Sequence, residues 1–294
     1  MTKPFSGIYP ALLTPFTKQN EINEAALTRL IEYNIKKGVS GFYVTGSTGE
    51  AFLLSFEERK QVMKLVKEVV GNRCKLIAQV GCIATHQAIE LAKYAETLGY
   101  DAISSVAPYY YKFSFKEVKD YYFDIVNAVS LPMIIYNIPS FSGVNLSVDN
   151  LNEFLKDDRF IGVKHTSNDY FALERFTSAH PDKVFYNGFD EMMLAGLIMG
   201  ADGAIGSTFN FMAEKFIKLQ SLFSANKIAE AQALQTQINE IIAVLCEVGV
   251  MAGEKEVLNQ LGFEFGDCRK PFKKLTDSEK LLITQKIMPF VEKE

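Results

Sequence analysis

The sequence contains few residues of the kinds that build metal centres or disulfide frameworks. Its 294 residues include four cysteines, three histidines and no tryptophan. The cysteines form no CxxC pair, and the histidines form no HExxH or HxH motif, which are spacings typical of zinc sites. We therefore predict no bound metal and four free thiols, the usual state in a reducing compartment.

Several other classes of partner are disfavoured by what the chain lacks. The formal charge of −4 and the absence of a Lys/Arg-rich run argue against nucleic acid. No stretch of about 18 or more apolar residues occurs, so no membrane span is predicted. The apolar run after Met1–Ser6 is broken by Pro10 and Pro15, unlike a signal-peptide core, and we expect a cytoplasmic protein. The glycine-rich GSTGE at Gly46–Glu50 is neither GxGxxG nor a Walker motif, so no nucleotide cofactor is predicted.

Short apolar runs rich in Val and Ile recur along the first two-thirds of the chain. Each ends in glycine, proline or small polar residues, a pattern typical of parallel strands that are buried on both faces. The predicted strands are Ile8–Phe16, Gly41–Thr45, Leu76–Val80, Ala102–Ala107, Met133–Ile138, Ile161–Lys164, Val184–Tyr186 and Gly203–Ile205.

Between and after these runs, apolar residues recur with helical spacing. The predicted helices are Ala25–Lys37, Phe56–Val70, His86–Leu98, Lys116–Ala128, Val148–Leu155, Glu214–Ser224, Ile228–Cys246, Lys255–Leu261 and Ser278–Phe290. Ser55 followed by Glu58 predicts a capping box, and Ser147 predicts another helix start.

This alternation predicts an α/β fold, a (β/α)8 TIM barrel with a C-terminal helical appendage. An open doubly wound sheet is the alternative, but no glycine fingerprint follows the first strand. We place the barrel at residues 1–226 and the helical extension at residues 227–294.

Lys164 is the lone charged residue inside the apolar runs. It could be a strand-end lysine whose stem packs while its ammonium reaches water. It could instead be a barrel-interior amine, because burial disfavours the ammonium form and favours a neutral nucleophile for a carbonyl. Active sites of such barrels lie at the C-terminal ends of the strands, and Tyr136 ends the preceding strand. The phenol and the amine therefore predict an acid–base pair.

Other polar groups are predicted at the same ends of the strands. The small-residue turn at Ser47 and Thr48 suits a carboxylate or phosphate, although an ordinary glycine turn is an equal alternative. Asp190 and Glu191 could stabilise a helix N-terminus or accept hydrogen bonds from a polyol. The Tyr109–Tyr111 run could belong to the core or to a subunit interface.

Five motifs in order give the chain a close resemblance to a known family. They are GSTGE (Gly46–Glu50), YNIPSFSG (Tyr136–Gly143), GVKHTS (Gly162–Ser167), GFDE (Gly188–Glu191) and GAIGSTFN (Gly203–Asn210). The chain resembles the N-acetylneuraminate lyase and dihydrodipicolinate synthase superfamily over almost its whole length. The resemblance implies a cofactor-free class I aldolase, usually a homotetramer, that binds pyruvate as a Schiff base.

Roles carried over from the family follow its motifs position by position. The resemblance implies that Lys164 forms the Schiff base and that Tyr136 transfers protons. It also implies that Ser47 and Thr48 hold the pyruvate carboxylate, and that Tyr110 reaches a site across a tight dimer interface. In the lyase branch, the positions that bind the sugar correspond to Thr166, Gly188, Asp190, Glu191 and Ser207.

Position 141 separates the branches of the superfamily. The synthases typically have an arginine there that grips a substrate carboxylate, whereas Phe141 can neither pair a charge nor donate two hydrogen bonds. The resemblance therefore favours the lyase branch, which implies reversible cleavage of N-acetylneuraminate to N-acetylmannosamine and pyruvate. The alternatives are another pyruvate-dependent aldolase or dehydratase acting on a keto-deoxy sugar acid, dihydrodipicolinate synthase itself, and a catalytically silent binding protein.

Overall fold

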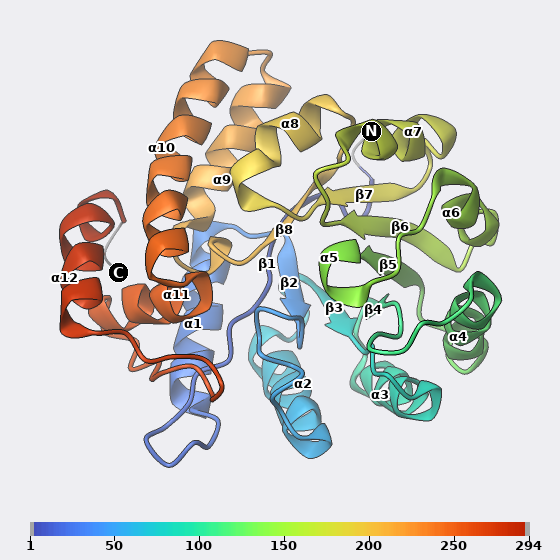
Figure 1. Cartoon of the computed structure of the whole chain (residues 1–294), viewed down its shortest axis with the longest axis horizontal. Helices are drawn as coiled ribbons and strands as arrows, with labels where there is room; N and C mark the ends of the chain where they lie inside the picture. The colour runs from blue at the N-terminus through green and yellow to red at the C-terminus, as the bar shows by residue number, and fades with distance from the viewer. Residues whose placement is uncertain (1–2, 292–294) are drawn as a thin grey trace. The chain divides into compact units, whose positions relative to one another are not determined.

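The computed structural model describes residues 3–291 and contains the predicted alternation of strands and helices (Figure 1). The strands are β1 (Gly7–Pro10), β2 (Gly41–Val44), β3 (Lys75–Gln79), β4 (Ala102–Val106), β5 (Met133–Asn137), β6 (Phe160–His165), β7 (Val184–Asn187) and β8 (Gly203–Gly206). They form one sheet in the order β1-β8-β7-β6-β5-β4-β3-β2. A parallel bridge between Ala11 and Tyr43 extends β1 and β2, the two ends of that order. The fold is a (β/α)8 barrel, as predicted.

The helices follow the strands and then continue alone at the C-terminal end of the described chain. They are α1 (Glu24–Lys37), α2 (Phe56–Val70), α3 (Thr85–Leu98), α4 (Phe115–Asn127), α5 (Pro139–Ser142), α6 (Val148–Leu155), α7 (Tyr170–Ala179), α8 (Met193–Ile198), α9 (Phe209–Ser224), α10 (Ile228–Val248), α11 (Val250–Gln260) and α12 (Asp277–Lys286). Two 3-10 turns, η1 (Asp190–Met192) and η2 (Met288–Phe290), complete them. None of these helices is long and apolar enough to cross a membrane.

Two compact units divide the chain. Unit 1 runs from Lys75 to Ile205 and includes the N-terminal residues up to Gly7; unit 2 runs from Ile8 to Cys74 and continues from Gly206 onward. Unit 1 holds β3 to β7 with the helices that pack beside them, including α3 against β4 and α6 against β6. Unit 2 holds β2, α1 and α2 together with α9 to α12. The boundary between a barrel and an extension at residues 226 and 227 stays a prediction.

Both predicted helix starts are confirmed by reciprocal hydrogen bonds. The Glu58 carboxylate accepts from the Ser55 N–H at 2.7 Å, and the Glu58 N–H donates to the Ser55 hydroxyl at 3.2 Å. Ser147 and Asn150 form the same box before α6. Each box satisfies two N–H groups that a helix start otherwise leaves without a partner.

The ends of several elements differ from the predictions. The first strand ends at Pro10 instead of Phe16, since proline has no N–H for a sheet ladder. The last predicted helix ends at Lys286 and gives way to a 3-10 turn at Pro289, where proline cannot donate a helical hydrogen bond. Helices α9 and α11 begin earlier than predicted, at Phe209 and Val250.

Three helices, α5, α7 and α8, were not predicted from the sequence. Helices α5 and α8 have four and six residues, too few for an apolar period to stand out. Helix α7 has ten residues and is preceded by Asp169, whose side chain accepts a hydrogen bond from the Ala172 N–H at 2.9 Å. An Asp immediately before an apolar-periodic segment was a start signal that could have identified it.

Candidate active site

Lys164 and Tyr136 lie side by side on neighbouring strands of unit 1. They are directly opposite in the parallel register of β5 and β6. The Lys164 Nζ lies 4.2 Å from the centre of the Tyr136 ring. Each residue is only 4% exposed. This burial rules out the alternative of a strand-end lysine whose ammonium reaches water, and it leaves an amine and a phenol in contact inside the protein.

The direction of Lys164 follows from its neighbour in the strand. His165 points towards the helices, because its ring packs edge-to-face on Phe176 of α7 at 5.6 Å. Successive side chains of a strand point to opposite faces, so Lys164 faces the interior of the barrel. A second tyrosine, Tyr186 of β7, is opposite Lys164 on the other side. Its hydroxyl donates to the Phe5 carbonyl at 2.5 Å.

Thr166 and Gly188 meet just beyond the ends of β6 and β7. The Thr166 hydroxyl is buried and has no hydrogen-bond partner within residues 3–291. A Cβ added to Gly188 would lie 1.9 Å from that hydroxyl oxygen, so only glycine fits here. A buried hydroxyl without a partner is costly. It is therefore a group to which a ligand can supply a hydrogen bond.

The acidic pair that follows Gly188 begins a short 3-10 turn. Asp190 is buried and Glu191 is half-buried, and they occupy the first two positions of η1. Their position therefore agrees with the prediction that Asp190 and Glu191 lie at a helix N-terminus. The alternative, that they bind a polyol, stays a prediction.

The remaining predicted residues lie elsewhere in the two units. Ser47, Thr48 and Ser207 belong to unit 2, and all three are half-buried. Tyr110 belongs to unit 1 and is 84% exposed, with a backbone φ of 78° and its ring edge-to-face against Tyr111 at 5.0 Å. Because its side chain is exposed, Tyr110 does not belong to the hydrophobic core. Its role across a subunit interface stays a prediction, as do the roles of the three unit 2 residues.

A polar pair behind the predicted active-site residues was not assigned a role from the sequence. Asn137 and His165 follow Tyr136 and Lys164 and are opposite each other in the same register. The His165 Nε2 lies 3.0 Å from the Asp169 carbonyl oxygen, which can only accept, so this nitrogen donates. The Nδ1 then accepts from the Asn137 amide at 3.2 Å. A neutral imidazole thus joins the two strands that position the amine and the phenol.

This pair predicts a pH-dependent stability. Burial lowers the pKa of His165 from its ordinary value of 6.5, so below that pH the unfolded chain binds the proton more readily than the folded chain. Stability is therefore fully present above pH 6.5 and decreases as the pH falls. We expect the melting temperature of the native protein to drop more than that of His165→Gln between about pH 7 and about pH 5.5.

Thermal unfolding followed by circular dichroism measures this difference. Burial also lowers the pKa of His180, which contributes a pH dependence common to both proteins. Equal pH dependence in the two proteins would contradict the assignment of a buried neutral imidazole at position 165.

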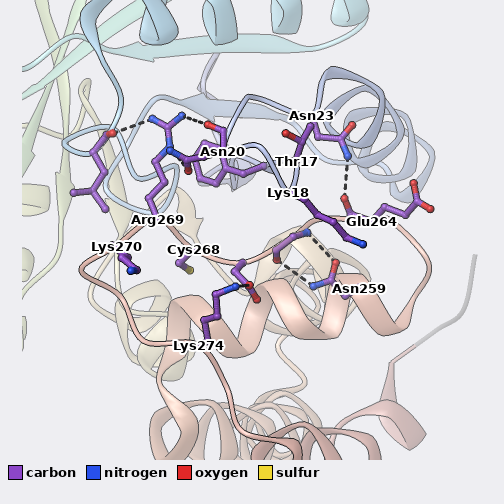
Figure 2. A pocket seen from close by; sticks show the side chains of 14 residues that line it. Thr17, Lys18, Asn20, Asn23, Asn259, Glu264, Cys268, Arg269, Lys270 and Lys274 are labelled. Carbon is purple, nitrogen blue, oxygen red and sulfur yellow. Dashed lines mark hydrogen bonds and ion pairs between the residues drawn. The ribbon is translucent and has the colours of Figure 1, made fainter.

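A cavity of about 980 Å³ lies in unit 2 and contains none of the predicted residues (Figure 2). Its wall includes Arg269, whose side chain donates to the Asn20 and Leu53 carbonyls at 2.8 and 3.0 Å. The same guanidinium binds the Glu58 carboxylate and lowers the pKa of Glu58 to about 2. This cavity is distinct from the Lys164–Tyr136 site.

With this geometry, the comparisons with known proteins identify the family. The dihydrodipicolinate synthetase family matches residues 4–288. The chain belongs to this family. Similar solved structures include CdNal from Clostridium difficile in complex with mannosamine, at 44% identity over 95% of this chain and 97% of that one, with a TM-score of 0.93.

Two further solved structures are also similar to this chain. An N-acetylneuraminate lyase from Fusobacterium nucleatum, complexed with pyruvate, is 41% identical over 97% of this chain and 98% of that one, with a TM-score of 0.91. A dihydrodipicolinate synthase is 27% identical over 96% of this chain and 97% of that one, with a TM-score of 0.90. The fold is shared equally with both, whereas the sequence is closer to the lyase.

Proposed function

We propose that this protein is an N-acetylneuraminate lyase, which reversibly cleaves N-acetylneuraminate into N-acetylmannosamine and pyruvate. It is a carbon–carbon lyase of the class I aldolase type. The observation that carries the proposal is the buried Lys164 amine, 4.2 Å from the Tyr136 ring, in a chain closer in sequence to lyases than to a synthase. Phe141 supports the same branch, because it is 73% exposed and cannot pair with a second substrate carboxylate.

The first half of the reaction forms the covalent intermediate. The unprotonated form of the Lys164 amine attacks the C2 ketone of the open-chain sugar acid and gives a carbinolamine. The hydroxyl group of this carbinolamine takes up a proton and leaves as water, which gives a protonated imine. Tyr136 lies beside this amine and is the proton carrier in this scheme. No metal or organic cofactor is required, because the positively charged imine nitrogen accepts electrons from the breaking bond.

The second half breaks the carbon–carbon bond and releases the products. Tyr136, together with the substrate carboxylate, takes the proton of the C4 hydroxyl while the C3–C4 bond breaks. The electron pair of that bond moves towards the imine and forms an enamine, and N-acetylmannosamine leaves as the aldehyde. A proton returns to C3, and water then hydrolyses the imine to release pyruvate and the free amine.

The other predicted residues have binding roles in this proposal. Ser47 and Thr48 hold the carboxylate of pyruvate through hydroxyl and N–H groups. The polyhydroxylated chain is bound by Thr166, Gly188, Asp190, Glu191 and Ser207. Support for this assignment comes from the buried Thr166 hydroxyl, which has no hydrogen-bond partner within the described residues.

We also propose a cytoplasmic homotetramer in which Tyr110 completes the site of a neighbouring subunit. The exposed aromatic side chains of Tyr110 and Tyr111 support this, because aromatic residues are enriched at subunit interfaces. Light scattering on the purified protein tests the assembly: the mass of four chains supports it, and that of a single chain contradicts it. Cell fractionation tests the location.

A coupled assay for pyruvate release from N-acetylneuraminate tests the function. We expect turnover with this substrate that exceeds turnover with other keto-deoxy sugar acids offered in parallel. Cleavage of one of those acids but not of N-acetylneuraminate would favour the alternative of another pyruvate-dependent aldolase.

A further inference from the structure

The turn that holds Ser47 and Thr48 has an unusual backbone at both ends. Thr45 and Glu50 each have a φ of 56°, in the left-handed region that residues other than glycine seldom adopt. Such residues persist only where the surrounding structure fixes them, and they cluster at functional sites. Contacts outside the turn must therefore hold it in this conformation.

The first of these contacts is made by the segment after β1. The Thr14 hydroxyl donates to the Gly49 carbonyl at 2.8 Å. The backbone of Gly49 lies so close to this segment that an added Cβ would be 2.8 Å from the Leu12 carbonyl oxygen. This contact fixes the middle of the turn and requires glycine at position 49.

The second contact is an ion pair between the end of the turn and α11. The Glu50 Oε1 lies 2.5 Å from the Lys255 Nζ, and the two side chains are 0% and 1% exposed. The Glu50 Oε2 accepts a hydrogen bond from the Arg269 N–H at 2.8 Å. One oxygen of Glu50 is therefore ion-paired with Lys255, and the other accepts a hydrogen bond from the backbone at Arg269.

The partners of Glu50 are themselves fixed around one aromatic ring. The Lys255 Nζ lies 4.2 Å from the centre of the Phe16 ring and donates to the Asp267 carbonyl at 3.3 Å. The Arg269 guanidinium lies 4.3 Å from the centre of the same ring and donates a hydrogen bond to the carbonyl of Leu53, which follows the turn. Lys255 and Arg269, the partners of Glu50, are therefore held in place by further contacts.

The buried ion pair between Glu50 and Lys255 requires both charged groups to lose their hydration, a free-energy cost that apolar side chains would not have. Burial lowers the pKa of Lys255, and the attraction of Glu50 raises it by less. A buried ion pair generally adds little net stability relative to apolar residues of the same size, because both charges lose their hydration. Stability alone therefore does not account for the pair.

We propose that Glu50 and Lys255 are positioning residues for pyruvate. Their ion pair holds the turn so that the hydroxyl and N–H groups of Ser47 and Thr48 face the pyruvate carboxylate, while the N–H groups of Gly49 and Glu50 donate within the turn. Neither residue touches substrate; they act through the backbone between Thr45 and Glu50. The inference rests on the proposed function, because it requires the turn to be the carboxylate-binding element.

Glu50→Gln tests this role. Glutamine has nearly the same shape and keeps an acceptor for the Arg269 N–H, but it leaves the Lys255 ammonium without its counter-charge. We expect the half-saturating pyruvate concentration to rise about tenfold or more, while turnover at saturating pyruvate changes less than about threefold. Steady-state kinetics in the direction of synthesis measures both, and trapping of pyruvate by borohydride at increasing concentrations measures the first independently.

A double variant separates positioning from a general effect on folding. Glu50→Gln with Lys255→Met removes both charges of the pair and leaves neither one without its counter-charge, so the melting temperature should return towards that of the native protein. The raised requirement for pyruvate should remain, because the anchor of the turn is still absent. The double variant also provides the test if the single variant fails to fold.

Glu214→Gln is the matched control, because it removes the 3.5 Å ion pair with Lys37 elsewhere in unit 2. Its half-saturating pyruvate concentration should equal that of the native protein. The inference is overturned if the double variant recovers normal pyruvate affinity together with its stability. If the native protein traps no pyruvate, the proposed function fails, and this inference fails with it. If the native protein and Glu50→Gln trap pyruvate with equal affinity, the inference alone is overturned.

Discussion

Lys164→Ala is expected to abolish pyruvate release from N-acetylneuraminate, with a loss of about 10³-fold or more in turnover. The amine is the atom that bonds to the substrate, so no neighbouring group can replace its electron-accepting imine. Its burial inside the barrel, at 4% exposure, also excludes a substitute amine from solvent-facing lysines. The coupled pyruvate assay measures the loss.

Covalent trapping locates the reactive amine directly. Borohydride added with pyruvate should attach the reduced adduct to the peptide that contains Lys164, and the alanine variant should give no adduct. Lys183→Ala is the matched control, because Lys183 is also buried in unit 1, at 6% exposure, and pairs with Asp158 at 3.6 Å. An adduct on any other lysine, or none in the native protein, would refute the mechanism.

Tyr136→Phe should lower turnover by about 10²- to 10⁴-fold, the range expected for the loss of a general acid–base group. Phenylalanine keeps the aromatic ring against the Lys164 Nζ and removes only the hydroxyl. We therefore expect borohydride to trap pyruvate on Lys164 in this variant when pyruvate is saturating. The combination of trapped adduct and slow cleavage would assign the hydroxyl to proton transfer during bond breaking.

Tyr186→Phe is a control on the other side of the same lysine. Tyr186 is opposite Lys164 in the register of β6 and β7, but its hydroxyl is bound to the Phe5 carbonyl. Loss of the Tyr186 hydroxyl should lower the melting temperature, since one neutral hydrogen bond contributes about 1 kcal/mol to stability. Turnover should stay within about threefold of that of the native protein. Equal losses of turnover in the two variants would show that Tyr136 has no special role.

The local sequence determined the barrel and the reactive pair because each depends on a short-range pattern. Apolar runs followed by helical periods predict parallel strands with crossover helices, and eight such units close a barrel. A single charge within an apolar run identified Lys164, and strand order placed Tyr136 beside it. The structure confirms that adjacency, since the two residues are opposite each other in register. Capping boxes at Ser55 and Ser147 were readable because all their atoms lie within one turn of helix.

The tertiary structure decided which polar residues are anchored to one another. Glu50 and Lys255 lie 205 positions apart in the sequence, and no local pattern marks them as an ion pair. The sequence shows a glycine-rich turn, and only the fold reveals that α11 holds its last residue through buried charges. His165 and Asn137 likewise needed the register of β5 and β6 before they could be joined. Periodicity therefore determined the order of strands and helices and the position of Lys164 in its strand, whereas the contacts around Lys164 and Glu50 join residues that only the folded chain brings together.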